Sequence, residues 1–138
     1  MSKENQRVMN VLFIDDNRID HQVFRGLLEL CDVPVRLIVL DNGEAAITFC
    51  KNLTDLAMIP DVIFCDINMP KINGWGFLDE YSKLDIAQRK KIPLYMISNS
   101  LMPEEIKRAN TDPFCNGFIT KPVKLHALNA IIMKHASD

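Results

Sequence analysis

Largely apolar runs of four to eight residues recur along this chain, and a segment with helical spacing separates each run from the next. Continuous apolar runs of this length are typical of strands buried on both faces of a parallel sheet. We therefore predict strands over residues 8–14, 33–40, 62–65, 92–97 and 115–120. The intervening patterns predict helices over residues 19–30, 44–50 and 75–84, from Pro103 to Asp112-Pro113, and after Lys121-Pro122 to about residue 135.

Five strands that alternate with five helices predict an α/β fold, with a five-stranded parallel sheet in the order 2-1-3-4-5 and helices on both of its faces. With 138 residues, the chain is predicted to form a single domain over residues 1–138, preceded by a flexible tail over residues 1–7. Gly26 lies inside the first predicted helix, where glycine costs about 1 kcal/mol relative to alanine. We therefore expect another element to pack closely against that position.

Polar residues follow every predicted strand, and those after four of the strands are candidates for one site. Asp15 and Asp16 end the first strand and Asp66 ends the third, while Ser98 and Lys121 end the fourth and fifth. In a sheet of this order, ligands bind beyond the carboxyl ends of the strands, where strands one and three lie side by side. These five residues, far apart in the sequence, are therefore expected to share one site.

Three carboxylates in one site repel one another, by up to about 4 kcal/mol per pair at 4 Å and an effective dielectric of 20. Such a cluster holds either a proton or a cation, and Mg²⁺ prefers oxygen ligands of this kind. The usual companion of Mg²⁺ is a phosphoryl group, for which a carboxylate can be the covalent acceptor. A lysine and a hydroxyl can stabilise the transferred oxygens.

Composition excludes several classes of protein. The formal charge is −2 and no basic stripe is visible, so we expect no binding of nucleic acid; Arg89-Lys90-Lys91 is interpreted as a solvated helix end. No apolar run approaches the roughly 20 residues of a membrane span, which predicts a cytoplasmic protein without membrane contact. The four cysteines are widely spaced and are expected to be reduced and mostly buried, and the three histidines are assigned no chemistry.

Several short motifs together identify a resemblance. They are Phe13-Ile14-Asp15-Asp16-Asn17, Asp41-Asn42-Gly43-Glu44-Ala45-Ala46, the stretch from Pro60 to Pro70, Asn73-Gly74, Ile97-Ser98 and Lys121-Pro122. With these motifs, which span nearly the whole chain, it resembles the receiver domains of two-component response regulators, and in particular the stand-alone regulators of chemotaxis. The resemblance implies the flavodoxin-like receiver fold and a bacterial signalling protein rather than an enzyme, with at most weak self-phosphorylation and self-dephosphorylation.

The resemblance also implies a role for each matched residue. Asp66 corresponds to the aspartate that accepts a phosphoryl group from a sensor histidine kinase or a phosphotransfer protein. Asp16, Asp66 and the backbone carbonyl of Asn68 correspond to ligands of Mg²⁺, and Asp15 acts mostly through water. Lys121 corresponds to the lysine that binds a phosphoryl oxygen, and the family often has a cis bond at the position of Lys121-Pro122. Ser98 and Phe118 correspond to the switch residues. Asn68 and Ser100 correspond to the residues that tune the lifetime of the phosphoryl group.

Some residues depart from the commonest pattern of the family. Ser98 and Phe118 stand where threonine and tyrosine are more frequent, and Asn99 stands where a small residue is usual, which bears on access of small phosphodonors. Output is expected through the fourth helix, fifth strand and fifth helix, toward a partner protein or a second copy of the chain. The apolar residues of this output segment are Leu101, Met102, Ile106, Phe114, Phe118, Val123 and Leu125, about half of which we expect to be core.

Other classes of protein share parts of this pattern. A phosphatase resembling the haloacid dehalogenases also uses an acceptor aspartate, a lysine and Mg²⁺, but expects an acid where Asn68 stands. A flavodoxin-like electron carrier is rejected, because Asp15 and Asp16 would repel the flavin phosphate. The phosphatase and a receiver-like scaffold that is never phosphorylated remain the alternatives.

Overall fold

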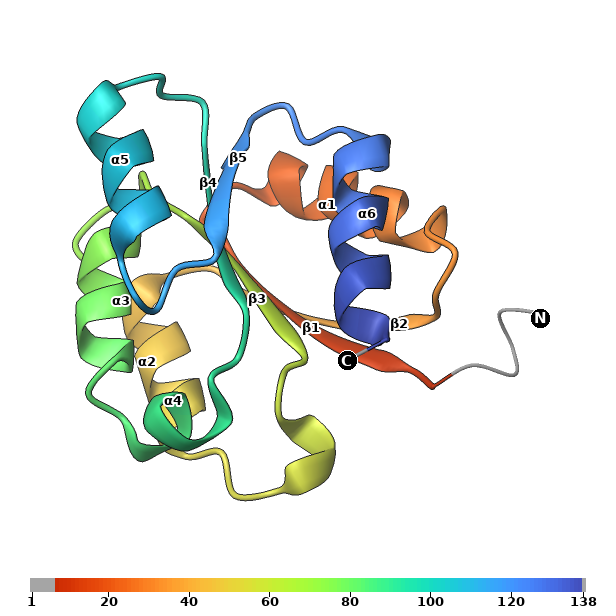
Figure 1. Ribbon diagram of the computed structural model, residues 1–138, viewed down its shortest axis with the longest axis horizontal. Coiled ribbons are helices and arrows are strands. Elements are labelled where there is room, and N and C mark those ends of the chain that lie inside the picture. Colours follow the sequence, from red (N-terminus) through yellow and green to blue (C-terminus); the bar gives the residue numbers. More distant parts are fainter. Residues whose placement is uncertain (1–6, 138) are drawn as a thin grey trace.

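A central parallel sheet organises the protein (Figure 1), whose computed structural model describes residues 7–137. Its strands are β1 (Met9–Ile14), β2 (Val35–Leu40), β3 (Val62–Asp66), β4 (Leu94–Ser98) and β5 (Gly117–Thr120). They are hydrogen-bonded in the order β2-β1-β3-β4-β5, and every pair is parallel. The predicted fold class and strand order are confirmed. The predicted tail lies mostly outside the described residues, although Arg7, its last residue, pairs with Asp61 at 3.0 Å.

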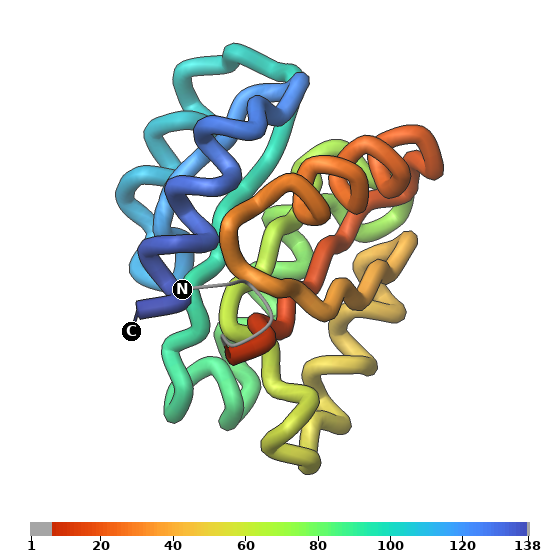
Figure 2. The backbone as a smooth tube through the Cα atoms, turned by 90° about the vertical axis from the view of Figure 1, so that its right-hand side faces the viewer, coloured from red at the N-terminus to blue at the C-terminus, as the bar shows by residue number. Residues whose placement is uncertain are grey.

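Helices cover both faces of the sheet. One face carries α1 (Arg18–Glu29) and α6 (Leu125–Ala136), and the other carries α2 (Gly43–Lys51), α3 (Gly74–Tyr81), α4 (Asp85–Lys90) and α5 (Pro103–Thr111). Figure 2 views the first of these faces, where α6 lies beside α1. Among the described residues, no helix combines the length and the apolar character that crossing a membrane requires.

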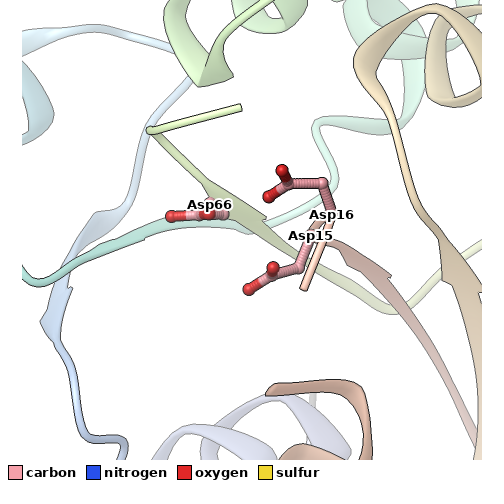
Figure 3. Close-up of side chains that lie close together, drawn as sticks. All are labelled: Asp15, Asp16 and Asp66. Carbon is pink, nitrogen blue, oxygen red and sulfur yellow. The ribbon is translucent and has the colours of Figure 1, made fainter. Parts of the chain in front are cut away.

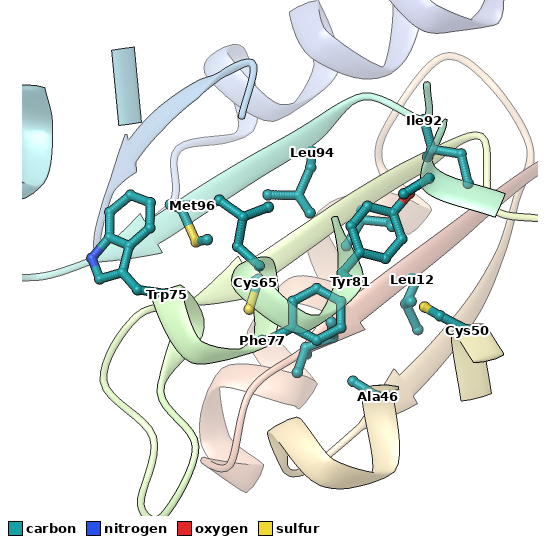
Figure 4. Close-up of a cluster of buried hydrophobic side chains, with 14 of the residues drawn as sticks. Leu12, Ala46, Cys50, Cys65, Trp75, Phe77, Tyr81, Ile92, Leu94 and Met96 are labelled. Atoms are coloured by element: carbon teal, nitrogen blue, oxygen red, sulfur yellow. The ribbon is translucent and has the colours of Figure 1, made fainter. Parts of the chain in front are cut away.

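Each face of the sheet has its own apolar core. Phe13, Phe24 and Leu128 belong to the core beneath α1 and α6. Cys65, Phe77 and Tyr81 belong to the core on the opposite face, which Figure 4 shows between the sheet and helices α2 and α3. β3 contributes alternate residues to both cores, which explains why its sequence is apolar without alternation. As predicted, all four cysteines are free, and three of them are buried.

Two elements were not predicted from the sequence: α4 and a short 3-10 helix over Leu56–Met58. Helix α4 has six residues, too few for helical periodicity to show, and only Ile86 and Ala87 are buried. Its exposed side carries an ion pair of 2.7 Å between Asp85 and Arg89, and it ends at Lys91 in the left-handed conformation. The helix predicted over residues 75–84 corresponds to α3 (Gly74–Tyr81), and α4 (Asp85–Lys90) follows it in a polar segment for which no helix was predicted.

Glycine is required where α3 begins. A Cβ atom on Gly74 would lie 2.7 Å from the backbone oxygen of Asp66, so only glycine lets α3 start against the end of β3. The expectation for Gly26 is wrong, because a Cβ there would meet nothing within 4 Å.

Strand register decides which polar residues meet. Ile14 pairs with Cys65, so Asp15 and Asp66, each one residue further along, lie at the same level of neighbouring strands. Asp66 pairs with Ile97, and the backbone N–H of Lys121 donates to the carbonyl of Ser98 at 2.9 Å. The four strand ends that carry these residues therefore open onto one edge of the sheet.

Candidate functional site

Three carboxylates form the centre of the site. Ligand atoms of Asp15, Asp16 and Asp66 all lie within 4.8 Å of one another, and Figure 3 shows them gathered at the ends of β1 and β3. Asp15 is fully buried and Asp66 is 4% exposed, whereas Asp16 is exposed to solvent. The cluster thus has two charges inside the protein and one at its mouth.

The turn after β1 holds these carboxylates in place. Asn17 caps α1 by accepting hydrogen bonds from the backbone N–H groups of Ile19 and Asp20, at 2.8 and 3.1 Å. The backbone N–H of Asn17 in turn donates to the carboxylate of Asp15 at 2.8 Å. The ring Nε2 of His21 contacts the backbone oxygen of Asp15, a structural role for a histidine to which the sequence assigned no chemistry. The first turn of α1 therefore anchors Asp15 from both its side chain and its backbone.

Burial changes the acidity of the cluster. It raises the pKa of Asp66 from 3.8 to about 6; Lys121 opposes this rise, and the charge of Asp15 adds to it. Burial also raises the pKa of Asp15, against the hydrogen bond from Asn17 and the charge of Lys121. Both carboxylates are therefore costly to ionise without a cation, and a bound cation would relieve that cost.

Lys121 supplies the positive charge. Its Nζ atom lies 2.7 Å from Asp20, 3.1 Å from Asp15 and 3.5 Å from Asp66. Burial lowers the pKa of this lysine, but these three carboxylates outweigh burial and raise it overall. The peptide bond between Lys121 and Pro122 is cis.

Asp20 is a further residue of the site, and its role was not predicted from the sequence. It lies in the first turn of α1, where an acidic residue usually serves the helix dipole. Because that role already explains an acidic residue at this position, the sequence does not indicate its contact with Lys121, which is 101 positions away in the chain. Its contact with the site could have been suggested by its position on α1, about one turn after Asp15 and Asp16.

Ser98 is held by two donors. Its Oγ accepts from the side-chain amide of Asn68 at 3.1 Å and from the backbone N–H of Ser100 at 3.0 Å. Ser98 is fully buried, whereas Asn68 is exposed at the mouth of the site. The residues predicted to tune lifetime are therefore both bonded to the predicted switch hydroxyl.

An open hollow of about 590 Å³ lies over these groups. Its lining residues are Asp16, Asn17, Asp20, Asp66, Asn68, Asn99, Lys121 and Pro122. Carboxylate oxygens are ligands that suit a hard divalent ion, so the residues fit Mg²⁺, and the lysine fits an anion beside it. The hollow can therefore receive a phosphoryl group next to Asp66.

The predicted output segment divides between the two cores. Phe114 and Phe118 are half-buried against the core that contains Cys65, whereas Val123 and Leu125 pack against the core beneath α1 and α6. Only Leu101 and Met102 are largely exposed, at 69% and 54%. The exposed apolar surface is thus smaller than the sequence suggested and lies at the start of α5.

A doubly wound parallel sheet with an acidic cluster, a lysine and a buried hydroxyl at its carboxyl edge is the arrangement expected of the receiver domains that the sequence resembles. Residues 11–133 match the family model of the response regulator receiver domain. The chain belongs to this family, and the resemblance found in its sequence is confirmed. It is therefore a receiver domain of two-component signalling.

Individual relatives agree with this assignment. The chain is 28% identical over 133 residues to the sensor histidine kinase CheAY of Helicobacter pylori, covering 96% of this chain but only 16% of that protein. A crystal structure of a two-component response regulator from Cytophaga hutchinsonii has a TM-score of 0.85 and 26% identity, covering 97% of this chain and 100% of the other. The phosphorylated cyanobacterial phytochrome response regulator RcpA has a TM-score of 0.72 and 25% identity, covering 93% and 91%.

Proposed function

We propose that Asp66 accepts a phosphoryl group from the phosphohistidine of a sensor histidine kinase or of a phosphotransfer protein. The observation that carries this proposal is the contact of Lys121 with Asp66 and Asp15 beside an open hollow of about 590 Å³. Membership of the receiver family and the phosphorylated state of the similar RcpA support it. The cytoplasmic location predicted from the sequence stays a prediction.

The transfer needs no base. A carboxylate oxygen of Asp66 attacks phosphorus, the P–N bond breaks, and its electron pair returns to the ring nitrogen, while the proton on the other ring nitrogen stays in place. The pKa of Asp66, about 6, leaves it ionised and nucleophilic at neutral pH. Lys121 then contacts the transferred oxygens and stabilises their charge.

Mg²⁺ fits the same residues. Asp16, Asp66 and the backbone carbonyl of Asn68 would hold it, with Asp15 acting through water. When bound, the ion neutralises charge on the phosphoryl oxygens and on the carboxylates. Asp16, the exposed member of the cluster, lies at the mouth of the site and would be the first ligand to meet an ion from solvent.

Output follows from the hydroxyl of Ser98. In the resting state its oxygen accepts hydrogen bonds from Asn68 and Ser100, and a phosphoryl oxygen offers its O–H a charged acceptor. Movement of Ser98 toward the phosphoryl group frees space for the half-buried ring of Phe118 to turn inward. The surface of α5, β5 and α6, including the exposed Leu101 and Met102, then changes shape and engages a partner protein or a second copy.

Mass spectrometry of the intact protein tests the acceptor. Incubated with Mg²⁺ and acetyl phosphate, the wild type should gain the mass of one phosphoryl group, and Asp66→Ala should gain none. Equal labelling of the two proteins would refute the assignment of Asp66. The alternatives give different results: a phosphatase would turn over p-nitrophenyl phosphate repeatedly, and a silent scaffold would leave the wild type unlabelled.

A further inference from the structure

The shortest ion pair of the site involves a residue that the proposed reaction does not use. The Nζ atom of Lys121 is 2.7 Å from the carboxylate of Asp20, closer than it is to Asp15 or Asp66. An ammonium group has three donors. Two of the nearby carboxylates, Asp15 and Asp20, accept hydrogen bonds from it, so a phosphoryl oxygen on Asp66 must share Lys121 with these partners or displace one of them.

The three carboxylates differ in how readily they can release Lys121. Asp15 is fully buried and is held by the backbone N–H of Asn17, and Asp66 is the group that becomes phosphorylated. The side chain of Asp20 is 32% exposed, so it can turn into solvent and be hydrated there. It also lines the hollow directly, beside the place of the incoming group. Asp20 is therefore the partner that an anion would displace.

We propose that Asp20 competes with the phosphoryl group for Lys121 and so stabilises the unphosphorylated state. The inference rests on the proposed function, since it requires a phosphoryl group on Asp66. Its physical basis is that an ion pair present only in the resting state lowers the affinity for any ligand that must break it. Asp20 then acts as a positioning residue that sets how much donor the protein needs.

The opposite role for Asp20 makes the opposite prediction. If Asp20 instead held Lys121 in the conformation that binds the phosphoryl group, its removal would disorder the lysine side chain and weaken the binding of anions. Asp20→Asn removes the charge with little change in shape, and Asp20→Glu keeps the charge. Glu44→Gln is the matched control, because it removes one exposed negative charge from the first turn of α2, away from the hollow.

Calorimetric titration of each protein with beryllofluoride in the presence of Mg²⁺ measures the affinity for a phosphoryl mimic. We expect Asp20→Asn to bind roughly two- to fivefold more tightly than the wild type, the range for loss of a partly exposed ion pair. Asp20→Glu and Glu44→Gln should stay close to the wild type. With acetyl phosphate, the concentration that gives the half-maximal labelling rate should fall in Asp20→Asn, while the limiting rate changes less.

Unchanged or weaker binding of beryllofluoride by Asp20→Asn would refute the proposed competition. An equal gain in affinity in Glu44→Gln would also refute it, because the gain would then be a general effect of net charge. Failure of the wild type to bind beryllofluoride or to be labelled at Asp66 would instead refute the proposed function, and this inference with it. Thermal unfolding checks that each variant is folded. Should Asp20→Asn not fold, Asp20→Ala takes its place with the same expectation.

Discussion

Replacing Asp66 by asparagine should stabilise the metal-free protein at neutral pH. The carboxyl group lies buried at the end of β3, and its pKa is raised from 3.8 to about 6, chiefly by burial. The folded state therefore binds a proton more tightly than the unfolded state does. Stability from this group is fully present below about pH 4 and is lost as the pH rises through 6, because ionisation is then harder in the fold than in the open chain.

The size of the effect follows from that pKa difference. About two pKa units, at about 1.4 kcal/mol each, set an upper value of about 3 kcal/mol above pH 7. The attraction of Lys121 is already contained in the raised pKa of Asp66. Relaxation and solvent at the open mouth reduce the gain, so we expect about 1–3 kcal/mol, or several degrees in Tm for a chain of this length.

Urea unfolding followed by circular dichroism, in EDTA, measures this difference. Asp66→Asn should unfold at higher urea than the wild type at pH 7.5, and roughly a third of its advantage should remain at pH 4.5. Asp41→Asn is the control, since Asp41 follows β2 at the same edge of the sheet but is exposed. It should stay within about 0.5 kcal/mol of the wild type at both pH values.

Two results would refute this reasoning. A variant less stable than the wild type at pH 7.5 would mean that the contacts of ionised Asp66 outweigh the cost of burying it. An advantage of equal size at both pH values would assign the gain to packing rather than to charge. Added Mg²⁺ provides a further check, because it should stabilise the wild type more than the variant, which lacks one ligand charge.

Three further predictions concern the ion, the lifetime and the output. Asp16→Ala should weaken Mg²⁺ binding at least about tenfold by calorimetry, because few charged ligands offset dehydration of the ion; unchanged affinity would place the ion elsewhere. The phosphorylated protein should decay over minutes or longer, since neither Asn68 nor Ser100 can activate water strongly; decay within seconds by mass spectrometry would contradict this. Phe118→Ala should leave labelling of Asp66 intact but remove phosphorylation-dependent association in sedimentation, and a variant that still associates would exclude this ring from the switch.

The periodicity of the chain was enough to predict the architecture. Each strand is a short apolar run, and the crossover rules leave few arrangements for five of them, so the strand order followed. The predictions were poorest for short or polar elements. In α4, two buried residues among six carry too little pattern to distinguish a helix from a loop, and only packing against the core at Ile86 and Ala87 reveals it.

The sequence by itself determined which polar residues meet, because parallel strands bring their carboxyl ends to one edge whatever their side chains do. It could thus bring Asp15, Asp66 and Lys121 together without coordinates. Only the tertiary structure decided how these groups pair. The ion pair between Asp20 and Lys121 joins residues 101 positions apart in the chain. The hydrogen bond between Asn68 and Ser98 joins residues 30 positions apart. Such contacts depend on rotamers and on tenths of an ångström, which a pattern of apolar and polar positions does not encode.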